Sequence, residues 1–425
     1  MPFETAHPPR GRRIAVVGGG ISGLGAAYAL AGDNRVVVFE AAGRLGGHAR
    51  TVVARGLAVD TGFIVYNERN YPRLTGLFRK LDVPTEASNM SFAASFDGGR
   101  MEYALRSLDT LFATRSNLVR PSFVRMTLDI LRFNRDAHIA LDRPELSLGA
   151  LLDELKLGDA FRRWYLAPFA GAIWSAPERD VLAFPASTLV RFFANHGLLA
   201  RTGQPEWRTV TGGSRVYVEK LASAIRRAGG EIRLAAPVEA VEATAGPTVR
   251  ARGSAPERFD AVILACHSDQ ALRLLADPGP DRSRILGALR YRPNRAVLHS
   301  DARQMPERRR CWSSWNFQGR SDAASAEVGV TYWMNRLQNL PNNQPLFVTL
   351  NPSQPIDEAK IHDETTFAHP IFDRAAVEAQ SALGGVQGRD GLWFAGAYAR
   401  YGFHEDGLAS GLAAAEALGA TPAWA

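Results

Sequence analysis

The glycine-rich stretch between Arg13 and Leu30 constrains the fold of this chain more than any other feature. An apolar run over 14–17 predicts a buried parallel strand, which ends in Gly18-x-Gly20-x-x-Gly23. An alanine-rich segment with helical periodicity follows over 22–30, and a second apolar run over 36–39 ends in Glu40. Strand, tight turn, helix and strand in this order, closed by an acid, are typical of a dinucleotide-binding unit.

Each part of this unit has a physical task. The glycines allow the chain to turn and let the backbone approach a pyrophosphate, and the amides that open the helix attract phosphate oxygens. Glu40 lies where a carboxylate accepts both ribose hydroxyls, an arrangement that disfavours a 2′-phosphate. The sequence therefore predicts an adenine dinucleotide. Its predicted contacts at this end of the chain are Gly18, Gly20, Ile21, Ser22, Gly23, Glu40 and Ala41.

The residues after this acid indicate which dinucleotide it is. Arg44-Leu-Gly-Gly-His48 follows almost at once, and Asp60-Thr-Gly-Phe63 comes next. In these motifs the chain resembles the flavin amine-oxidase and phytoene-desaturase superfamily, whose FAD domain continues into an R-x-G-G motif. The resemblance implies that Arg44, Gly46, Gly47 and His48 lie against the pyrophosphate and flavin, with Gly62 and Phe63 beside the ring. Family members usually have arginine at the position of His48, so we expect a pH-dependent charge there.

The far end of the chain resembles the same superfamily. Gly391-Leu-Trp-Phe-Ala-Gly396 predicts a strand, and Gly402-Phe-His-Glu-Asp-Gly407 leads into a predicted helix over 408–418. In the superfamily this helix points its N-terminus at the flavin pyrimidine carbonyl, where its dipole stabilises negative charge. Segments 236–238 and 259–265 resemble the strands that complete the domain. The resemblance thus adds Val238, Ala265, Gly396, Glu405, Asp406 and Gly407 to the expected contacts with FAD, which we expect to be held non-covalently.

We therefore expect an α/β fold with a Rossmann-type FAD-binding domain and a discontinuous, mixed α+β substrate domain, as in amine oxidases. At 425 residues the chain is longer than one typical core requires. We assign 1–75, 205–275 and 385–425 to the FAD-binding domain, and 76–204 and 276–384 to the substrate domain. The first insert carries helical periodicity, and the second carries alternating segments typical of strands.

Two cysteines, Cys266 and Cys311, form neither a disulfide framework nor a metal-ligand pattern. We expect no metal site. No apolar run is long enough to span a bilayer, and no secretory signal is evident before the first strand. These observations favour a cytoplasmic location. The sequence does not indicate an oligomeric state.

Arginine provides nearly all the basic charge, because only four of the 50 Lys and Arg residues are lysines and the net charge is +7. Arginines and apolar residues interleave most densely over 111–135. Apolar residues recur there at helical spacing, namely Phe123, Met126 or Thr127, Ile130 and Phe133. The segment is either an ordinary surface helix with solvated arginines or a peripheral contact with an anionic membrane. It lacks a nucleic-acid-binding signature, so we expect no nucleic-acid partner.

Two departures from the amine-oxidase pattern bear on the substrate. Many amine oxidases place a lysine, through water, against flavin N5. The corresponding stretch here, 291–298, has no lysine, which leaves Asn294 as a catalytic candidate. Amine oxidases also hold the amine between two aromatic rings, and one of these positions matches His404. A histidine suits general-base catalysis better than an aromatic cage, although His404 has the alternative role of capping the helix or hydrogen-bonding the flavin.

Three central segments, 168–175, 192–199 and 207–214, resemble a bacterial subgroup of the superfamily. Its members are associated with enzymes that methylate unsaturated acyl chains of membrane phospholipids, such as cyclopropane synthases. The resemblance implies a flavoenzyme acting on an unsaturated fatty acyl chain, as in a step of furan fatty acid biosynthesis. We expect desaturation by allylic hydride transfer to flavin N5 and proton loss. The alternatives are double-bond isomerisation, amine oxidation and a non-catalytic flavoprotein.

Acyl chemistry needs an apolar passage and a base. The candidate lining residues are Phe169, Ile173, Trp174, Phe192, Phe193 and Trp207, each of which is otherwise ordinary core. His404 is the candidate proton acceptor, with Tyr401 and Trp333 as positioning candidates. His196 is a weaker candidate base. The expected ligand besides FAD is an unsaturated phospholipid or fatty acid.

Overall fold

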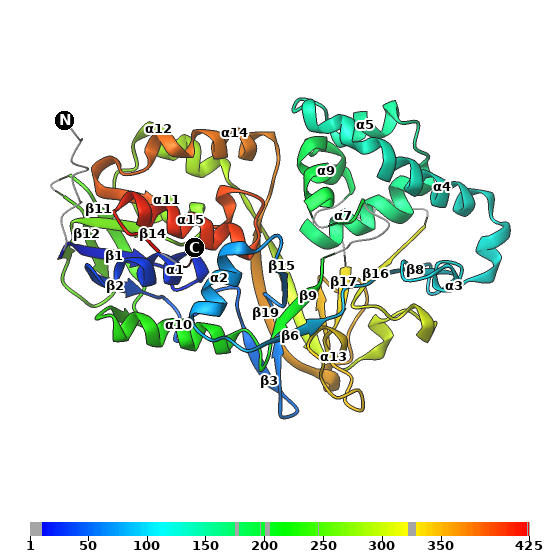
Figure 1. The fold of residues 1–425 in the computed structure, drawn as a ribbon, viewed down its shortest axis with the longest axis horizontal. Helices are drawn as coiled ribbons and strands as arrows, with labels where there is room; N and C mark the ends of the chain where they lie inside the picture. Colours follow the sequence, from blue (N-terminus) through cyan, green and yellow to red (C-terminus); the bar gives the residue numbers. More distant parts are fainter. Residues whose placement is uncertain are drawn as a thin grey trace.

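The computed structural model of the chain describes residues 11–174, 178–195, 197–199, 205–244, 246–321, 329–422 and 424. Figure 1 shows two lobes side by side, each built on one of the two larger sheets. In the first lobe the strands are parallel, in the order β10-β2-β1-β14-β20. These strands are β1 (Arg13–Val17), β2 (Arg35–Phe39), β10 (Glu231–Arg233), β14 (Ala261–Leu264) and β20 (Leu392–Phe394).

The parallel sheet is covered on both faces, which explains why its strands are continuously apolar. Ile14 and Val16 pack towards α1 (Ile21–Leu30), α10 (Arg215–Arg227) and α15 (His404–Ala417). Ala15 and Val17 pack towards the opposite layer. That layer consists of β11 (Val238–Glu242), β12 (Thr248–Ala251), β13 (Glu257–Arg258), α11 (Ser268–Leu274), α12 (Gly279–Ala288) and α14 (Arg374–Ala382).

The second lobe contains a mixed sheet with the strand order β19-β15-β18-β17-β16-β7-β8. Its strands are β7 (Phe92–Phe96), β8 (Met101–Ala104), β15 (Tyr291–His299), β16 (Trp315–Gly319), β17 (Gly329–Trp333), β18 (Phe347–Leu350) and β19 (Ile361–Pro370). Strands β16 and β7 pair in parallel, and the other neighbours pair antiparallel. Long strand β19 reaches back to the first lobe (Figure 1).

A helical layer packs above the mixed sheet and shares one apolar core with it. Its helices are α3 (Leu108–Leu111), α4 (Pro121–Asp136), α5 (Leu148–Glu154), α6 (Asp159–Phe161), α7 (Ala167–Trp174), α8 (Glu178–Ala183) and α9 (Ala186–Asn195). Smaller elements join the lobes: β3 (Thr51–Ala54), β4 (Leu57–Asp60), β5 (Val65–Asn67), β6 (Thr85–Ser88), β9 (Trp207–Val210), α2 (Pro72–Lys80) and α13 (Met334–Leu337).

The expected fold class is confirmed: an α/β Rossmann-type domain stands beside a mixed α+β domain. The parallel strands come from segments around 13–39, 231–264 and 392–394, which lie in the segments assigned to the FAD-binding domain. Helices α12 and α14 pack on that sheet although the assignment placed 276–384 in the other domain. In the part of the chain that the structure describes, every helix is too short or too polar to cross a bilayer.

Candidate active site

The turn between β1 and α1 forms an anion-binding cradle. Gly18 has φ +114°, and a Cβ there would lie 2.5 Å from the carbonyl oxygen of Ala265, so only glycine fits. Gly20 caps the helix without a side-chain hydrogen bond, and no atom lies within 4 Å of where its Cβ would be. The first amides of α1, including those of Ile21 and Ser22, therefore face open space suited to a pyrophosphate.

The Arg44–His48 loop lies directly over this cradle. Gly46 donates its amide to Gly19 O at 2.8 Å and forms an isolated bridge with Gly20. The Arg44 guanidinium donates to three carbonyl oxygens of its own loop: those of Leu45 (3.2 Å), Gly47 (3.0 Å) and Ala49 (3.3 Å). Arg44 thus braces the Gly46–Gly47 backbone, which lies against the start of α1.

Glu40 is held in one orientation by two backbone amides. Its carboxylate accepts from Gly19 N at 2.7 Å and from Ala42 N at 2.8 Å. Ala236 N donates to Glu40 O at 2.9 Å, which brings the segment leading to Val238 alongside Ala41. Each carboxylate oxygen keeps a lone pair for a ribose hydroxyl. The cradle, loop and carboxylate together fit an FAD.

Helices α1 and α15 cross so closely that their N-terminal turns meet. A Cβ on Gly407 would lie 3.0 Å from Ser22 Oγ, and a Cβ on Gly411 would collide with Ser22 O. Gly23 is also required, because a Cβ there would collide with Gly18 O. Gly396, after β20, donates its amide to Ser410 Oγ at 3.1 Å. The phosphate-binding turn and the first turn of α15 are therefore held side by side.

The first turn of α15 begins at His404, four residues earlier than the sequence predicts. Both Glu405 oxygens accept from α2, from Arg73 N and Leu74 N at 3.0 Å each. Asp406 Oδ2 accepts from Phe403 N at 2.9 Å. Burial raises the pKa of Glu405 and raises the pKa of Asp406 to about 6. These two carboxylates, which the resemblance predicts as contacts with FAD, accept from backbone amides at the starts of α2 and α15 and so cap these helices.

His404 lies in a cluster of rings at this turn. Its imidazole stacks on Phe63, with centroids 4.0 Å apart and planes 11° apart. Its Nε2 is 2.6 Å from the hydroxyl of Tyr217 on α10, and either group can be the donor. Burial lowers the pKa of His404 to about 3, so the imidazole is neutral at physiological pH. Position 62 must be glycine, because a Cβ on this residue would collide with His48 O where the segment before Phe63 passes the Arg44–His48 loop.

The expectation of a pH-dependent charge at His48 is wrong near neutrality. The ring lies 4.9 Å from Phe367, 5.6 Å from His267 and 5.8 Å from His369. Burial, and then these neighbouring imidazoles, lower the pKa of His48 to about 3. An arginine-like cation is therefore replaced here by a neutral ring. Among the described residues, no three His, Cys, Asp or Glu side chains are grouped to hold a metal ion.

A row of aromatic rings links the helical layer to α15. Phe92 contacts Phe169 at 4.9 Å, and Phe169 contacts Phe193 at 5.5 Å. Phe192 stacks on Phe403 with centroids 5.0 Å apart and planes 16° apart. Phe403 directly precedes His404. Three of the six residues expected to line an acyl passage, Phe169, Phe192 and Phe193, therefore belong to a group of packed rings that reaches Phe403, the residue before the candidate base in the sequence.

The other expected residues are placed differently. Ile173 packs half-buried against the same core, and Trp207 opens β9. Trp174 ends α7, but its side chain and all of His196 lie outside the described residues.

Asn294 is buried in β15, where it accepts from Asn351 Nδ2 at 2.7 Å. Trp333 contacts Trp312 edge-on, with ring centroids 5.3 Å apart. Tyr401 lies half-buried in the turn before α15. Their catalytic or positioning roles stay predictions.

Sequence reasoning missed two features of the site. Tyr217 follows the Gly212-Gly213-Ser214 turn at the start of α10, where its spacing indicates only core packing. Asp60 is fully buried and accepts from Thr51 Oγ1 (2.6 Å), Ser214 Oγ (2.7 Å) and Gln338 Nε2 (3.0 Å). Burial raises the pKa of Asp60 to about 6 despite these donors. Thr51 pairs with Asp60 across the β3–β4 hairpin, but Ser214 and Gln338 are remote in sequence, so no local pattern predicts these two partners.

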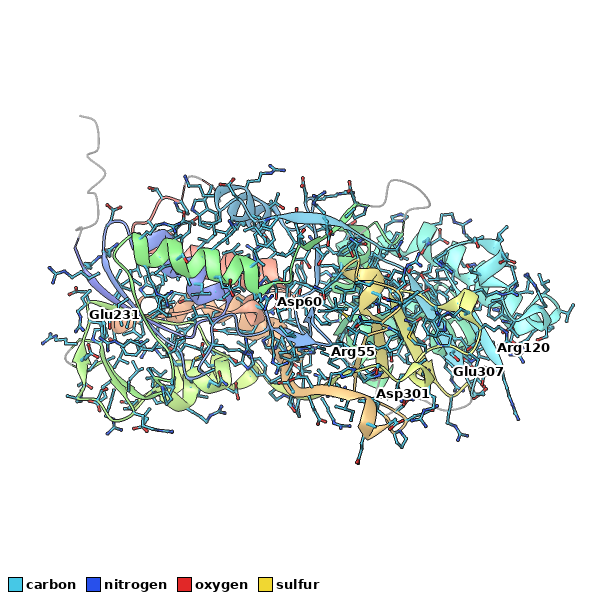
Figure 2. All side chains as sticks on the ribbon, turned by 90° about the horizontal axis from the view of Figure 1, so that it is seen from below. Arg55, Asp60, Arg120, Glu231, Asp301 and Glu307 are labelled. Atoms are coloured by element: carbon cyan, nitrogen blue, oxygen red, sulfur yellow. The ribbon has the colours of Figure 1, made fainter. Side chains whose placement is uncertain are left out.

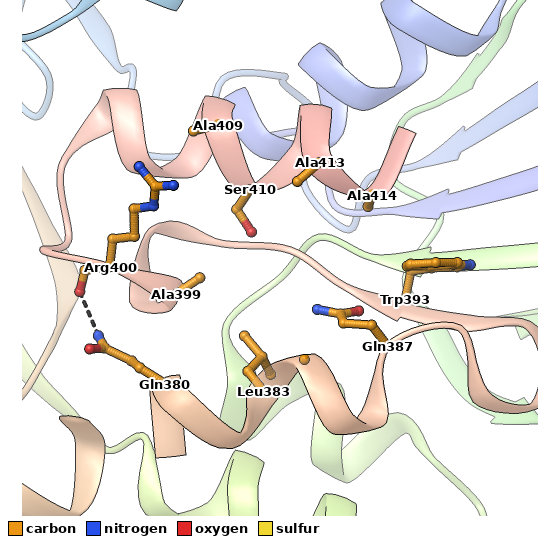
Figure 3. Close-up of a pocket in the computed structure, with 11 residues that line it drawn as sticks. Gln380, Leu383, Gln387, Trp393, Ala399, Arg400, Ala409, Ser410, Ala413 and Ala414 are labelled. Carbon is orange, nitrogen blue, oxygen red and sulfur yellow. Dashed lines mark hydrogen bonds between the residues drawn. The ribbon is translucent and has the colours of Figure 1, made fainter. Parts of the chain in front are cut away.

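A separate hollow of about 240 Å³ lies on another side of α15, between this helix and α14 (Figure 3). Ala409, Ser410 and Ala413 line it, whereas Gly407 and Gly411 face α1. Gln380 donates to the carbonyl of Arg400 at its rim. The hollow is lined by a different set of residues from the ring cluster at His404.

Comparison with known proteins agrees with this geometry. The family model for flavin containing amine oxidoreductase matches residues 21–419. Protoporphyrinogen oxidase 2 of Arabidopsis thaliana is 55% identical over 53 residues, which is 12% of this chain and only 10% of that protein. The structure of the fatty acid isomerase from P. acnes aligns with TM-score 0.67 and 13% identity, over 96% of this chain and 98% of that one.

A second solved structure, cyclohexylamine oxidase from Brevibacterium oxydans, aligns with TM-score 0.67 and 17% identity, over 96% of this chain and 99% of that one. At these identities the structures show the shared fold alone. The family match spans nearly the whole chain, and the glycine cradle and Glu40 fit the cofactor of that family. The chain belongs to the flavin containing amine oxidoreductase family, and its cofactor is FAD.

Proposed function

We propose that this oxidoreductase dehydrogenates an unsaturated fatty acyl chain of a membrane phospholipid at the cytoplasmic side. The observation that carries the proposal is the aromatic row that ends with Phe192 stacked on Phe403, directly before the neutral imidazole of His404. An acyl chain needs apolar walls and a base, and the proposal assigns these roles to the aromatic row that reaches Phe403 and to His404, the next residue in the sequence.

The same geometry disfavours an amine. A protonated amine is held best by a carboxylate or by facing aromatic rings. At the position that matches one cage ring, this chain has His404, which stacks on Phe63 and hydrogen-bonds Tyr217. The two carboxylates of the turn, Glu405 and Asp406, accept from backbone amides as helix caps.

Bound FAD supplies a two-electron acceptor for an allylic hydride. Loss of that hydride leaves positive charge spread over three carbons of the acyl chain, and proton loss from the adjacent carbon then gives a conjugated diene. In this proposal His404 accepts the proton at Nδ1. This requires the tautomer in which Nε2–H donates to the Tyr217 hydroxyl, so that the Nδ1 lone pair is free.

Double-bond isomerisation is the second candidate, because the solved structures that share this fold include a fatty acid isomerase. It needs the same apolar row and the same allylic hydride loss. The two reactions differ in whether the hydride returns to the other end of the allyl system or a proton is lost. A base at His404 would accept the proton that dehydrogenation releases, so we favour dehydrogenation over isomerisation.

The test is anaerobic absorbance of the FAD-loaded protein mixed with a phospholipid that carries one cis double bond per chain, followed by mass spectrometry of the extracted lipid. Bleaching of the flavin band with a product that lacks two hydrogen atoms supports dehydrogenation. Unchanged mass with a moved double bond makes the enzyme an isomerase. Bleaching by a polyamine or an aromatic amine, with no change in the lipid, overturns the acyl assignment.

A further inference from the structure

Exposed apolar side chains concentrate at one end of the second lobe. Of nine exposed large hydrophobic side chains in the part of the chain that the structure describes, seven lie between residues 105 and 131. We call them the docking face: Leu105, Leu108, Leu118, Val119, Val124, Leu128 and Leu131. Leu108 is 75% exposed and Val119 is 82% exposed. Leu118, Val124 and Leu128 also line a shallow surface groove.

Helix α4 is apolar on two sides, which corrects the sequence-based view of it. The stripe that was a candidate for membrane contact, including Phe123, Met126 and Phe133, is fully buried in the core of the second lobe. A different set, Val124 and Leu128, faces outward at a spacing of one helical turn. A helix that packs only against its own core has no physical need for this second apolar face.

Arginines surround the docking face. The segment 105–136 holds six arginines (Arg106, Arg115, Arg120, Arg125, Arg132 and Arg135) and three aspartates, which gives it a charge of +3. Arg115 pairs with Asp109 and Arg135 pairs with Asp136, each at 2.6 Å. The third aspartate, Asp129, is buried and pairs loosely with Arg125 at 3.7 Å and with Arg132 at 3.9 Å. Figure 2 places the Arg120 side chain at the end of the molecule farthest from Glu231 in the first lobe.

We propose that the docking face rests on the surface of an anionic lipid bilayer. Leucine and valine side chains enter the boundary between headgroups and acyl chains, and the surrounding arginines pair with lipid phosphates. Apolar residues inside a basic rim match an anionic membrane in both polarity and charge. A second copy of this chain would bring one set of arginines against another, and nucleic acid would leave the leucines in water.

The docking face is linked to the aromatic row through the inner side of α4. Phe133 on this helix contacts Phe193 edge-on at 6.2 Å, and neighbouring Phe192 stacks on Phe403. If the proposed function holds, the face would seat the enzyme where phospholipid acyl chains are available. Membrane binding itself does not rest on that function, because it needs no turnover.

The experiment is sedimentation of the FAD-loaded protein with vesicles, without substrate turnover. One set contains phosphatidylglycerol and phosphatidylcholine, and the other contains phosphatidylcholine alone. The test variant is L118S/V119S/L128S. The matched control is V53S/L234S, which removes exposed apolar side chains, 61% and 40% exposed, that lie outside the docking face. All of these side chains are exposed, so an unchanged flavin spectrum verifies that each variant is folded.

We expect the wild type and the control to bind anionic vesicles at least tenfold more tightly than neutral ones, and the test variant to lose at least tenfold in affinity. Raised salt should weaken binding of the wild type. Equal binding by the test variant and the control, or no binding by the wild type, overturns the proposal. A dimer that the test variant disperses, without vesicle binding, would show that the face joins two copies instead. Failure of lipid turnover with vesicle binding intact would overturn only the proposed function.

Discussion

The Tyr217 hydroxyl lies 2.6 Å from Nε2 of His404 and joins the middle of the chain to the first residue of its last helix. Helix α10 carries Tyr217, and α15 carries His404. Burial raises the pKa of Tyr217 well above its usual value, so the phenol is protonated and neutral. The hydrogen bond therefore fixes the plane of the imidazole, and the proposed mechanism uses the tautomer in which Nε2–H is the donor.

Replacing Tyr217 by Phe tests this coupling. The variant keeps the ring and its packing but leaves His404 Nε2 without its partner, so the productive tautomer is no longer favoured. We expect kcat for the acyl substrate to fall by at least about tenfold with little change in KM. Stopped-flow measurement of flavin reduction checks this. Y66F, at another buried tyrosine of the same core, should keep wild-type kinetics; equal losses in both variants would contradict the tautomer argument.

Acidification should destabilise the protein below pH 6.5. Burial lowers the pKa of His404 and of His48 to about 3, whereas an unfolded chain titrates near 6.5. Between these values the unfolded state binds more protons, so the free energy of unfolding falls as the pH drops. Each histidine contributes roughly 1 kcal/mol between pH 6.5 and 5.5.

Urea unfolding of the FAD-loaded protein at pH 7.5, 6.5 and 5.5 measures this slope. The H404Q variant should show a shallower dependence than the wild type, because one proton-linked group is gone. Substitution of exposed His138 by Gln is the control and should leave the slope unchanged. A slope that is identical in H404Q would mean that folding does not lower the pKa of His404.

Glu405→Ala separates a capping role from a cofactor-binding role. Removal of the carboxylate leaves the amides of Arg73 and Leu74 without their acceptor at the start of α2. We expect the free energy of unfolding to fall by about 2 kcal/mol, with FAD affinity changed less than threefold. Urea denaturation and FAD titration of the apoprotein measure the two effects. Exposed Glu416 on the same helix is the control, and Ala there should change neither.

The fold was predictable from sequence wherever an element depends on residues that are close together in the chain. A run such as 14–17, buried on both faces, must be continuously apolar, and Gly18 must adopt a positive φ beneath Ala265. These constraints leave a pattern in the sequence itself. The C-terminal helix begins four residues before its predicted start, because Glu405 and Asp406 read as polar loop until their amide partners are known.

The chemistry of the site was less predictable because it depends on contacts between remote segments. The position of His404 was recognised from a motif, but its Tyr217 partner lies 187 residues away. The loss of charge at His48 follows from burial against Phe367, His267 and His369, none of which is near it in the chain. Likewise, the periodicity of α4 predicts an apolar stripe on this helix. It does not show whether the core of the protein or another surface packs against that stripe.

A glycine of the cofactor cradle, Gly20, and a glycine of α15 that packs on it, Gly411, should respond in opposite ways to a methyl group. Gly20 has ordinary φ (−79°) and ψ, and its Cβ would meet no protein atom within 4 Å. Gly20→Ala should therefore leave the stability of the apoprotein within about 0.5 kcal/mol of wild type. The added methyl group would instead stand where the pyrophosphate approaches the helix, so FAD affinity should fall at least tenfold.

Gly411→Ala makes the opposite change, because its Cβ would collide with the Ser22 carbonyl and push α15 away from α1. This variant should lose several kcal/mol of stability, with FAD affinity falling as a consequence. Urea denaturation of the apoproteins, followed by FAD titration, distinguishes the loss of FAD affinity in Gly20→Ala from the loss of stability in Gly411→Ala. Gly384→Ala, in a segment with open space around it, is the control for both. A Gly20→Ala protein that binds FAD as tightly as the wild type would show that the pyrophosphate does not pass over this turn.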